Sequence, residues 1–159
     1  MAGRRRQRRL RRIANVEINA TYGEPVQWMS GSSGLLVQLV PSHRGPPPVE
    51  SRVPTGPTIQ ESAGKPGPVP TYEDLLQNAH DEDLFDYYVS SQLVLVDAQS
   101  GKLKEVGAPA IFDSVDRSPD GQHILVARIV PPYSYVLPAE GFAKQIEIWD
   151  RNGKLEYTR

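Results

Sequence analysis

The clearest pattern of apolar and polar positions in this chain lies between residues 111 and 129. Apolar β-formers stand on both sides of the tetrapeptide Ser118–Gly121, which reads SPDG. Proline fixes φ for the first corner of a type I turn, aspartate suits the second corner, and glycine accepts a left-handed exit. The pattern therefore predicts two short antiparallel strands joined by a tight turn.

The same order of apolar and turn residues occurs twice along the chain. Val26–Leu39 matches Val115–Arg128, and Leu93–Leu103 (LVLVDAQSGKL) matches Ile146–Leu155 (IEIWDRNGKL). In the second match, an apolar strand ends in aspartate and is followed by a Gly-Lys turn and another strand. Each unit then has four antiparallel strands, with an excursion between the second and the third. A four-stranded unit of roughly 40–50 residues is typical of a β-propeller blade.

We therefore expect an all-β fold, with about two four-stranded antiparallel blades of an incomplete β-propeller. The first blade spans residues 26–107 with an insertion at 41–91, the second spans 111–159, and residues 13–159 form one partial propeller domain. A blade cannot bury both of its faces alone. The chain is accordingly expected to belong to a larger propeller or to associate with itself through its unpaired blade faces.

The two excursions differ from the strands in composition. Residues 41–70 hold most of the 15 prolines and cannot form a helix or a central strand. Residues 71–90 are the best helical segment, with Thr71 as a cap at the start and Asp81 as a cap for a second turn. A second proline-bearing excursion follows at 131–144.

Equivalent connections leave successive antiparallel blades at the same end. The excursions 41–91 and 131–144 are therefore predicted to lie on one face and to touch. The apolar side chains expected at this contact are Leu84, Phe85 and Tyr88 from the helix, and Tyr133, Tyr135, Val136, Leu137 and Phe142 from the second excursion.

The composition excludes several kinds of site. The 159 residues contain no cysteine, so disulfides, thiolate catalysis and cysteine-based metal sites are ruled out. No run approaches the ~20 apolar residues of a membrane-spanning helix, and no membrane partner is expected. Acidic residues near His80 resemble a metal cluster, but such residues at a helix start more often complement the helix dipole. No metal and no cofactor are expected.

Net charge −1 hides an asymmetry between the start of the chain and its body. Residues 1–12 hold seven arginines, which leaves 11 basic against 19 acidic residues in the remainder. A basic arm on an acidic body can bind nucleic acid or an anionic membrane surface. No aromatic residue interleaves these arginines to stack on bases, so a solvated, disordered arm is the favoured interpretation and nucleic acid is disfavoured.

Longer stretches of the chain, together with the SPDG hairpin, carry a resemblance to a known family. They are NATYGEPVQW (Asn19–Trp28), LLVQLVP (Leu35–Pro41), VPTGPTIQESAGKPGPVPTYEDLL (Val53–Leu76), FDYYVSSQLVLVD (Phe85–Asp97) and FDSVDRSPDGQHILVARI (Phe112–Ile129). These stretches resemble the glutamyl endopeptidases, a branch of the prolyl oligopeptidase family of serine peptidases found in bacteria and plant chloroplasts. The insertion is the most specific part, because generic propellers have nothing like VPTGPTIQES.

The resemblance implies a parent protein that hydrolyses peptide bonds after acidic residues. Members carry a propeller, which restricts access to the active site, followed by an α/β-hydrolase domain with a Ser-Asp-His triad. Gly31–Leu35 (GSSGL) fails the G-x-S-x-G pattern of a nucleophile elbow at its last position, and His43, His80 and His123 are not placed as a triad partner. We expect this chain to be a non-catalytic internal segment of the propeller. The peptide substrate would bind through an α/β-hydrolase domain that lies outside this chain.

Two arginines are candidates for substrate contact, Arg128 and Arg44. Arg128 lies on a strand whose neighbours on both faces are apolar, so its charge must be paired or face the propeller channel. A guanidinium binds an acidic side chain through two parallel hydrogen bonds. The alternative is a structural pair with a carboxylate such as Asp116. Arg44, in the insertion, has similar chemistry with less constraint.

A second interpretation of the whole chain belongs to a different functional class. It is a stand-alone propeller-repeat module that binds proteins and has no enzymatic link. The arginine arm shows no apolar segment of a secretory signal behind it. The compartment is left open, with bacterial periplasm, cytoplasm and chloroplast all compatible with the resemblance.

Overall fold

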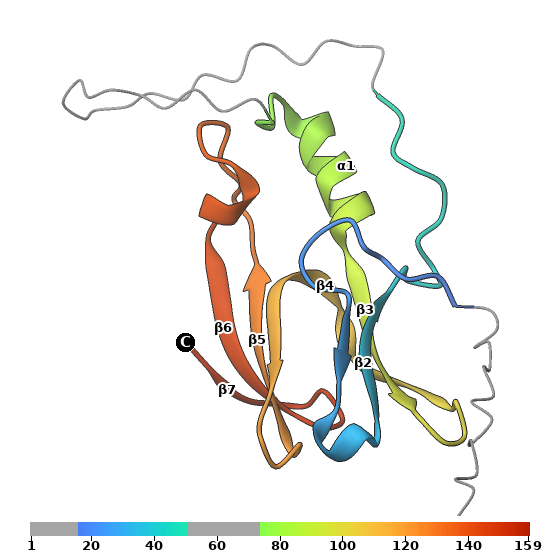
Figure 1. The fold of residues 1–159 in the computed structure, drawn as a ribbon. Helices are drawn as coiled ribbons and strands as arrows, with labels where there is room; N and C mark the ends of the chain where they lie inside the picture. Colours follow the sequence, from blue (N-terminus) through green and yellow to red (C-terminus); the bar gives the residue numbers. More distant parts are fainter. Residues whose placement is uncertain (1–15, 51–73) are drawn as a thin grey trace, which may run out of the picture.

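A computed structural model describes residues 16–50 and 74–159 of the protein and contains seven antiparallel strands in one open sheet (Figure 1). Each strand pairs with the strand before it in the sequence. The arginine arm and most of the proline-rich insertion lie outside the described residues. The strands are β1 Val26–Trp28, β2 Gly34–Leu39, β3 Ser91–Asp97, β4 Leu103–Arg117, β5 His123–Ile129, β6 Lys144–Asp150 and β7 Leu155–Thr158.

Helical structure is limited to three short segments in the part of the chain that the structure describes. They are the helix α1 (Ala79–Val89) and the 3-10 helices η1 (Ser30–Ser32) and η2 (Ala139–Gly141). The fold is mostly β, which confirms the expected all-β class and is consistent with an incomplete propeller-like sheet.

Strand β4 runs across the predicted boundary between the first blade, 26–107, and the second, 111–159. Its first half pairs with β3 and its second half pairs with β5. Gly107, with φ +64°, lets the backbone bend between the two partners without ending the strand. One strand therefore belongs to both four-stranded halves, β1–β4 and β4–β7.

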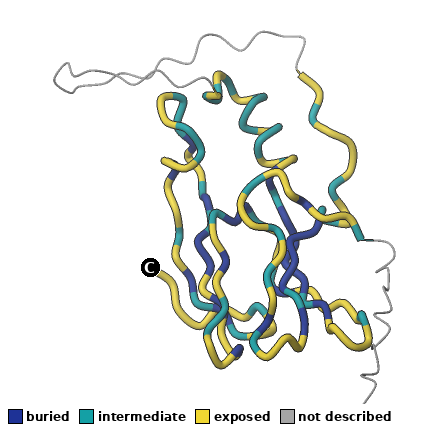
Figure 2. Tube along the Cα trace, in the orientation of Figure 1, coloured by how far each residue is buried: buried dark blue, intermediate teal, exposed yellow. Residues whose placement is uncertain are grey.

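The two halves of the sheet pack against each other. Because side chains alternate along a strand, one face of each half supplies every second residue to the shared core. Figure 2 shows buried residues concentrated in the strands at the centre of the sheet. The core residues are Met29, Leu36, Leu93, Val106, Phe112, Val115, Ile124, Val126 and Trp149.

The SPDG turn between β4 and β5 forms as predicted. The amide of Gly121 donates to the carbonyl of Ser118 at 2.9 Å, and Gly121 has φ +69°. The carboxylate of Asp120 accepts the amide of Gln122 at 3.0 Å, which explains the preference for aspartate at the second corner.

The β6–β7 hairpin also forms, but its loop has three residues and not the two that Asn152-Gly153 suggests. The amide of Asp150 donates to the carbonyl of Lys154 at 2.9 Å, and Gly153 takes the left-handed position with φ +79°. Farther from the loop, the register shifts between Ile148 and Trp149, which indicates a separate β-bulge in this pair of strands.

Helix α1 begins later than the expected segment 71–90, and its cap is Asn78, where the sequence suggested Asp81. The side-chain oxygen of Asn78 accepts the amide of Asp81 at 3.0 Å, and the carboxylate of Asp81 accepts the amide of Gln77 at 2.8 Å. Asparagine satisfies a free amide of the first turn as well as aspartate does. The proposed cap Thr71 lies outside the described residues.

The tight turns and the excursions occupy opposite ends of the sheet (Figure 1). The β1–β2, β3–β4, β4–β5 and β6–β7 turns lie at one end, and α1 lies at the other together with the loop between β5 and β6. For the described parts of the two excursions, the predicted placement on one face is confirmed.

Candidate substrate-contact site

Arg128 lies on β5 and faces the core between the two halves of the sheet. Its Nε donates to the carboxylate of Glu147 at 2.9 Å, its Nη2 donates to the same carboxylate, and Nη2 also reaches Oε1 of Gln145 at 3.1 Å. The pair is bidentate, the strongest geometry between these groups. The carboxylate partner is thus Glu147 and not Asp116, which lies on the opposite face of β4 because Val115 beside it points into the core.

Glu147 is almost completely buried, with 4% of its side chain exposed. It also accepts the indole Nε1 of Trp149 at 2.7 Å. Burial alone would raise the pKa of the Glu147 carboxyl, but the hydrogen bonds from Arg128 and Trp149 and the charge of Arg128 outweigh it. The pKa of Glu147 is therefore lowered, and the carboxylate stays charged inside the core.

The repeat makes this ion pair unusual for its position. In the internal match, Arg128 corresponds to Leu39 and Glu147 corresponds to Val94. Leu39 and Val94 are both buried in one apolar cluster of the first half. Replacing a buried ion pair by a well-packed apolar pair is often neutral or stabilising. Stability alone therefore does not explain why the second half carries Arg128 and Glu147.

The guanidinium of Arg128 is not fully used by this pair. Its described hydrogen bonds engage Nε and Nη2, and 28% of the side chain remains exposed. The Nη1 amino group makes no hydrogen bond to the described residues. Glu147 and Gln145 hold the guanidinium plane in a fixed orientation while this edge remains available.

Arg44 has a different setting, at the C-terminal end of α1. Its Nη2 donates to the carbonyls of Tyr88 at 3.3 Å and Ser90 at 3.0 Å, and its guanidinium lies over the ring of Tyr87 at 5.2 Å. A cation at this end satisfies free carbonyls and complements the helix dipole. Nε of Arg44 is buried with no hydrogen-bond partner among the described residues. The structure does not bring Arg44 and Arg128 together.

The two excursions touch, as predicted. The ring of Phe85 on α1 meets the rings of Tyr133 at 5.2 Å and Phe142 at 5.6 Å, both edge to face. The hydroxyl of Tyr133 donates to Asp86, and that of Tyr135 donates to Glu82. Burial and then the Asp86 carboxylate raise the pKa of Tyr133, so this hydroxyl remains a donor.

The contact includes Phe85, as predicted, but the other helix residues that take part differ from the predicted ones. Tyr88 is 47% exposed and Leu84 lies outside the cluster, whereas Val89 is buried in it together with Tyr133 and Phe142. The face follows helical spacing from Glu82 through Phe85 and Asp86 to Val89, which mixes apolar and acidic residues. Val136 and Leu137 of the second excursion were also expected at the contact, but both are exposed.

Replacing Phe85 with alanine is expected to separate the excursions. Loss of three-ring packing should destabilise the fold by about 2–3 kcal/mol, because Phe85 is partly and not completely buried. Urea denaturation measures the loss, and amide exchange near Tyr133 and Phe142 localises it. Leu84→Ala, one position away and outside the cluster, should cost less than about 1 kcal/mol. Equal losses for both variants would contradict the observed helix face.

Other kinds of site have little support in residues 16–50 and 74–159. No group of three or more His, Cys, Asp or Glu side chains there is arranged to hold a metal ion. A search of the same residues for a helix long and apolar enough to cross a membrane finds none. Nε2 of His123 lies 3.2 Å from the carboxylate of Glu156 on the surface.

The sequence pattern indicates Arg128 as a candidate, but Glu147 was not predicted. The available signal was the alternation in β6, where Glu147 shares a face with Trp149 while Ile146 and Ile148 share the other. Cross-strand register then sets Glu147 opposite Val126, diagonal to Arg128.

Comparison with known proteins finds relatives in plants. The chain is 42% identical over 141 residues to a protein of Arabidopsis thaliana named probable glutamyl endopeptidase, chloroplastic. It is 41% identical over 140 residues to a protein of the same name from Oryza sativa subsp. japonica. Over most of its length, the chain is therefore homologous to proteins with this name.

The matched region is most of this chain but only a small part of each plant relative. The matched residues make up 88% and 87% of this chain but only 14% and 15% of the Arabidopsis and rice proteins. The chain spans about one seventh of the length of these relatives. No protein-family model matches the sequence, and no solved structure matches it.

Proposed function

We propose that this chain is a non-catalytic β-propeller segment of a serine-type endopeptidase that cleaves after acidic residues, in which the propeller gates substrate access. The observation that carries the proposal is the 42% identity to a protein named glutamyl endopeptidase over 88% of the chain. The chain contains no G-x-S-x-G elbow, so the nucleophile would come from another part of the parent protein.

The internal repeat supports the assignment of these strands to a propeller. Leu125, Ile146 and Ile148 in the second half correspond to Leu36, Leu93 and Leu95 in the first. The three residues of the first half belong to or pack against the core between the halves. Leu125 and Ile146 are 45% and 39% exposed. The exposed face of the second half thus has the composition of a blade face that another blade covers.

Within this function, Arg128 is the proposed contact for an acidic substrate side chain. Its Nη1 edge is oriented by the bidentate pair with Glu147, and its position corresponds to a leucine in the other repeat. Arg44 is a weaker candidate, since the end of α1 already engages its guanidinium. We further propose that the end with both excursions faces the catalytic domain and forms part of the substrate entrance.

A chimera tests the proposal. The isolated chain should not hydrolyse a glutamate-containing reporter peptide, whereas the Arabidopsis relative should do so when the matched 141 residues of this chain replace its own matching segment. In that chimera, the double variant Arg128→Leu/Glu147→Val, which copies the pair of the first repeat, should lower kcat/KM for the glutamate reporter by about 10–100-fold. Unchanged kcat/KM in a folded chimera would exclude Arg128 as the contact. A folded but inactive chimera would contradict the propeller assignment.

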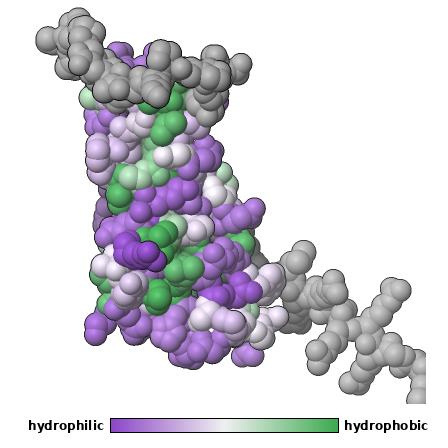
Figure 3. All heavy atoms as spheres, turned by 90° about the vertical axis from the view of Figure 1, so that its left-hand side faces the viewer, coloured by the Kyte–Doolittle hydropathy of each residue, from purple (hydrophilic) through white to green (hydrophobic). Residues whose placement is uncertain are grey.

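The isolated chain is also proposed to associate with itself through the exposed face of its second half. Figure 3, viewed from the β6–β7 side, shows apolar patches among hydrophilic atoms. Sedimentation velocity should show oligomers that Ile146→Glu dissolves, since a buried charge disfavours the contact. Leu137→Glu, at an exposed position of the second excursion, should leave the oligomer intact. A monomer at all concentrations would contradict this proposal.

A further inference from the structure

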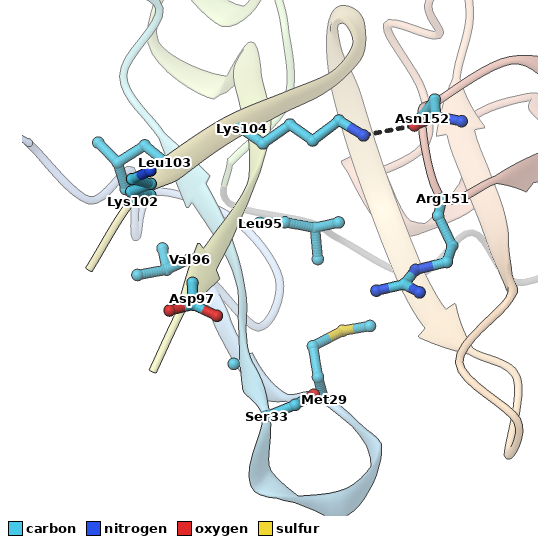
Figure 4. Close-up of a pocket in the computed structure, with 11 residues that line it drawn as sticks. Met29, Ser33, Leu95, Val96, Asp97, Lys102, Leu103, Lys104, Arg151 and Asn152 are labelled. Carbon is cyan, nitrogen blue, oxygen red and sulfur yellow. Dashed lines mark hydrogen bonds between the residues drawn. The ribbon is translucent and has the colours of Figure 1, made fainter. Parts of the chain in front are cut away.

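A cleft opens between the two halves of the sheet at the end that carries the tight turns. Its volume is about 510 Å³, and it lies between the β3–β4 region and the β6–β7 loop. Met29 and Leu95 supply apolar surface on one side (Figure 4). Arg151 extends its guanidinium into the same space from the β6–β7 loop, so both repeats contribute to the cleft.

The charged groups of the cleft are mainly cationic. Lys102, Lys104 and Arg151 line it. The ammonium of Lys104 donates to the side-chain oxygen of Asn152, which connects the two halves across the cleft. Asp97 also lines the cleft, but its carboxylate accepts the amide and the hydroxyl of Ser100, both at 2.6 Å.

The positive cleft contrasts with the rest of the molecule. Outside the arginine arm the chain has 11 basic against 19 acidic residues. A local excess of cations on an acidic body attracts a compact anionic group and repels an extended polyanion such as nucleic acid. The apolar surface of Met29 and Leu95 beside the cations adds a place for a short aliphatic stem.

We propose that this cleft binds the acidic side chains of an extended peptide. The carboxylate would rest on Arg151 and Lys104, and the methylene groups of the same side chain would lie against Met29 and Leu95. Arginine offers two parallel donors to a carboxylate and lysine adds a point charge, so glutamate fits both parts of the cleft. The proposal is independent of the peptidase role, because binding is measured on the chain itself.

The test uses fluorescence anisotropy with the full 159-residue chain and a labelled octapeptide of alternating glutamate and leucine. The expected result is saturable binding that weakens with salt. The counterpart with glutamine in place of glutamate should bind about tenfold more weakly or worse. Arg151→Gln should weaken binding of the glutamate peptide by about tenfold, and the double variant Lys104→Gln/Arg151→Gln should weaken it further.

Lys154→Gln is the matched control. Lys154 lies three residues after Arg151 in the same hairpin, is exposed, and does not line the cleft, so its variant removes the same charge and should change the affinity less than about twofold. Equal weakening by Lys154→Gln and Arg151→Gln would overturn the proposal, since it would indicate general attraction. Equal binding of the glutamine peptide, no binding at all, or displacement by an equal concentration of inorganic phosphate would also overturn it.

Discussion

Replacing Glu147 with valine should destabilise the protein by about 3 kcal/mol, because it leaves the guanidinium of Arg128 without its carboxylate beside an apolar core. The 28% exposure of Arg128 gives the charge some access to water, which keeps the loss near the lower end of the range for broken buried pairs. Urea denaturation followed by circular dichroism measures the change in the free energy of unfolding. A shift of about 6–12 °C in the melting temperature should accompany it.

The matched control is the double variant Arg128→Leu/Glu147→Val, which carries the same valine together with the leucine of the first repeat. Its free energy of unfolding should stay within about 1 kcal/mol of the unchanged protein, since the apolar pair needs no desolvation of charge. If the double variant is as unstable as the single one, packing around Glu147 and not the charge of Arg128 causes the loss.

The same pair makes stability depend on pH. The folded pKa of Glu147 is lower than that of an unfolded carboxyl, so the stabilisation is present above the unfolded pKa and is lost as pH falls through the folded pKa. The unchanged protein should therefore lose more stability on acidification than Arg128→Leu/Glu147→Val. Parallel pH profiles for the two proteins would contradict a charged Glu147 in the core.

Replacing Gly153 with alanine should cost about 3 kcal/mol or more. A Cβ at this position would lie 1.9 Å from the backbone nitrogen of Gly107, where β4 bends between its two partners. Neither backbone can move away easily, because the ring of Trp149 also lies against Gly107. The β6–β7 loop should separate from β4, and the variant should unfold at lower urea concentration.

Gly31→Ala is the matched control for Gly153→Ala. It measures the cost of placing alanine in a left-handed backbone conformation without the close contact to Gly107. Gly31 has φ +68°, close to the +79° of Gly153, but a Cβ there would meet nothing within 4 Å. The Gly31 variant should lose only about 1–2 kcal/mol, the cost of placing alanine in the left-handed region. Equal losses at the two positions would show that the approach of Gly153 to Gly107 adds no constraint.

The sequence by itself determined the local structure of this protein. The SPDG turn, the alternating strands around it and the repeat with Val26–Leu39 depend on neighbouring residues and on the period of two in a strand. The placement of both excursions at one end of the sheet could also be predicted from the sequence, since antiparallel strands reverse direction at every turn. The hairpin at Asn152-Gly153 was predicted at the correct position, but its loop has three residues and not two.

Tertiary structure decided which side chains meet across those elements. Arg128 pairs with Glu147 and not with Asp116 because register and parity place Glu147 on the same face, diagonal to Arg128. Helix α1 presents Phe85 and Val89 because it packs against Tyr133 and Phe142, which lie far away in the sequence. The contact between Gly107 and Gly153 depends on how two halves of a sheet pack. Such contacts join residues far apart in sequence, so no local pattern specifies them.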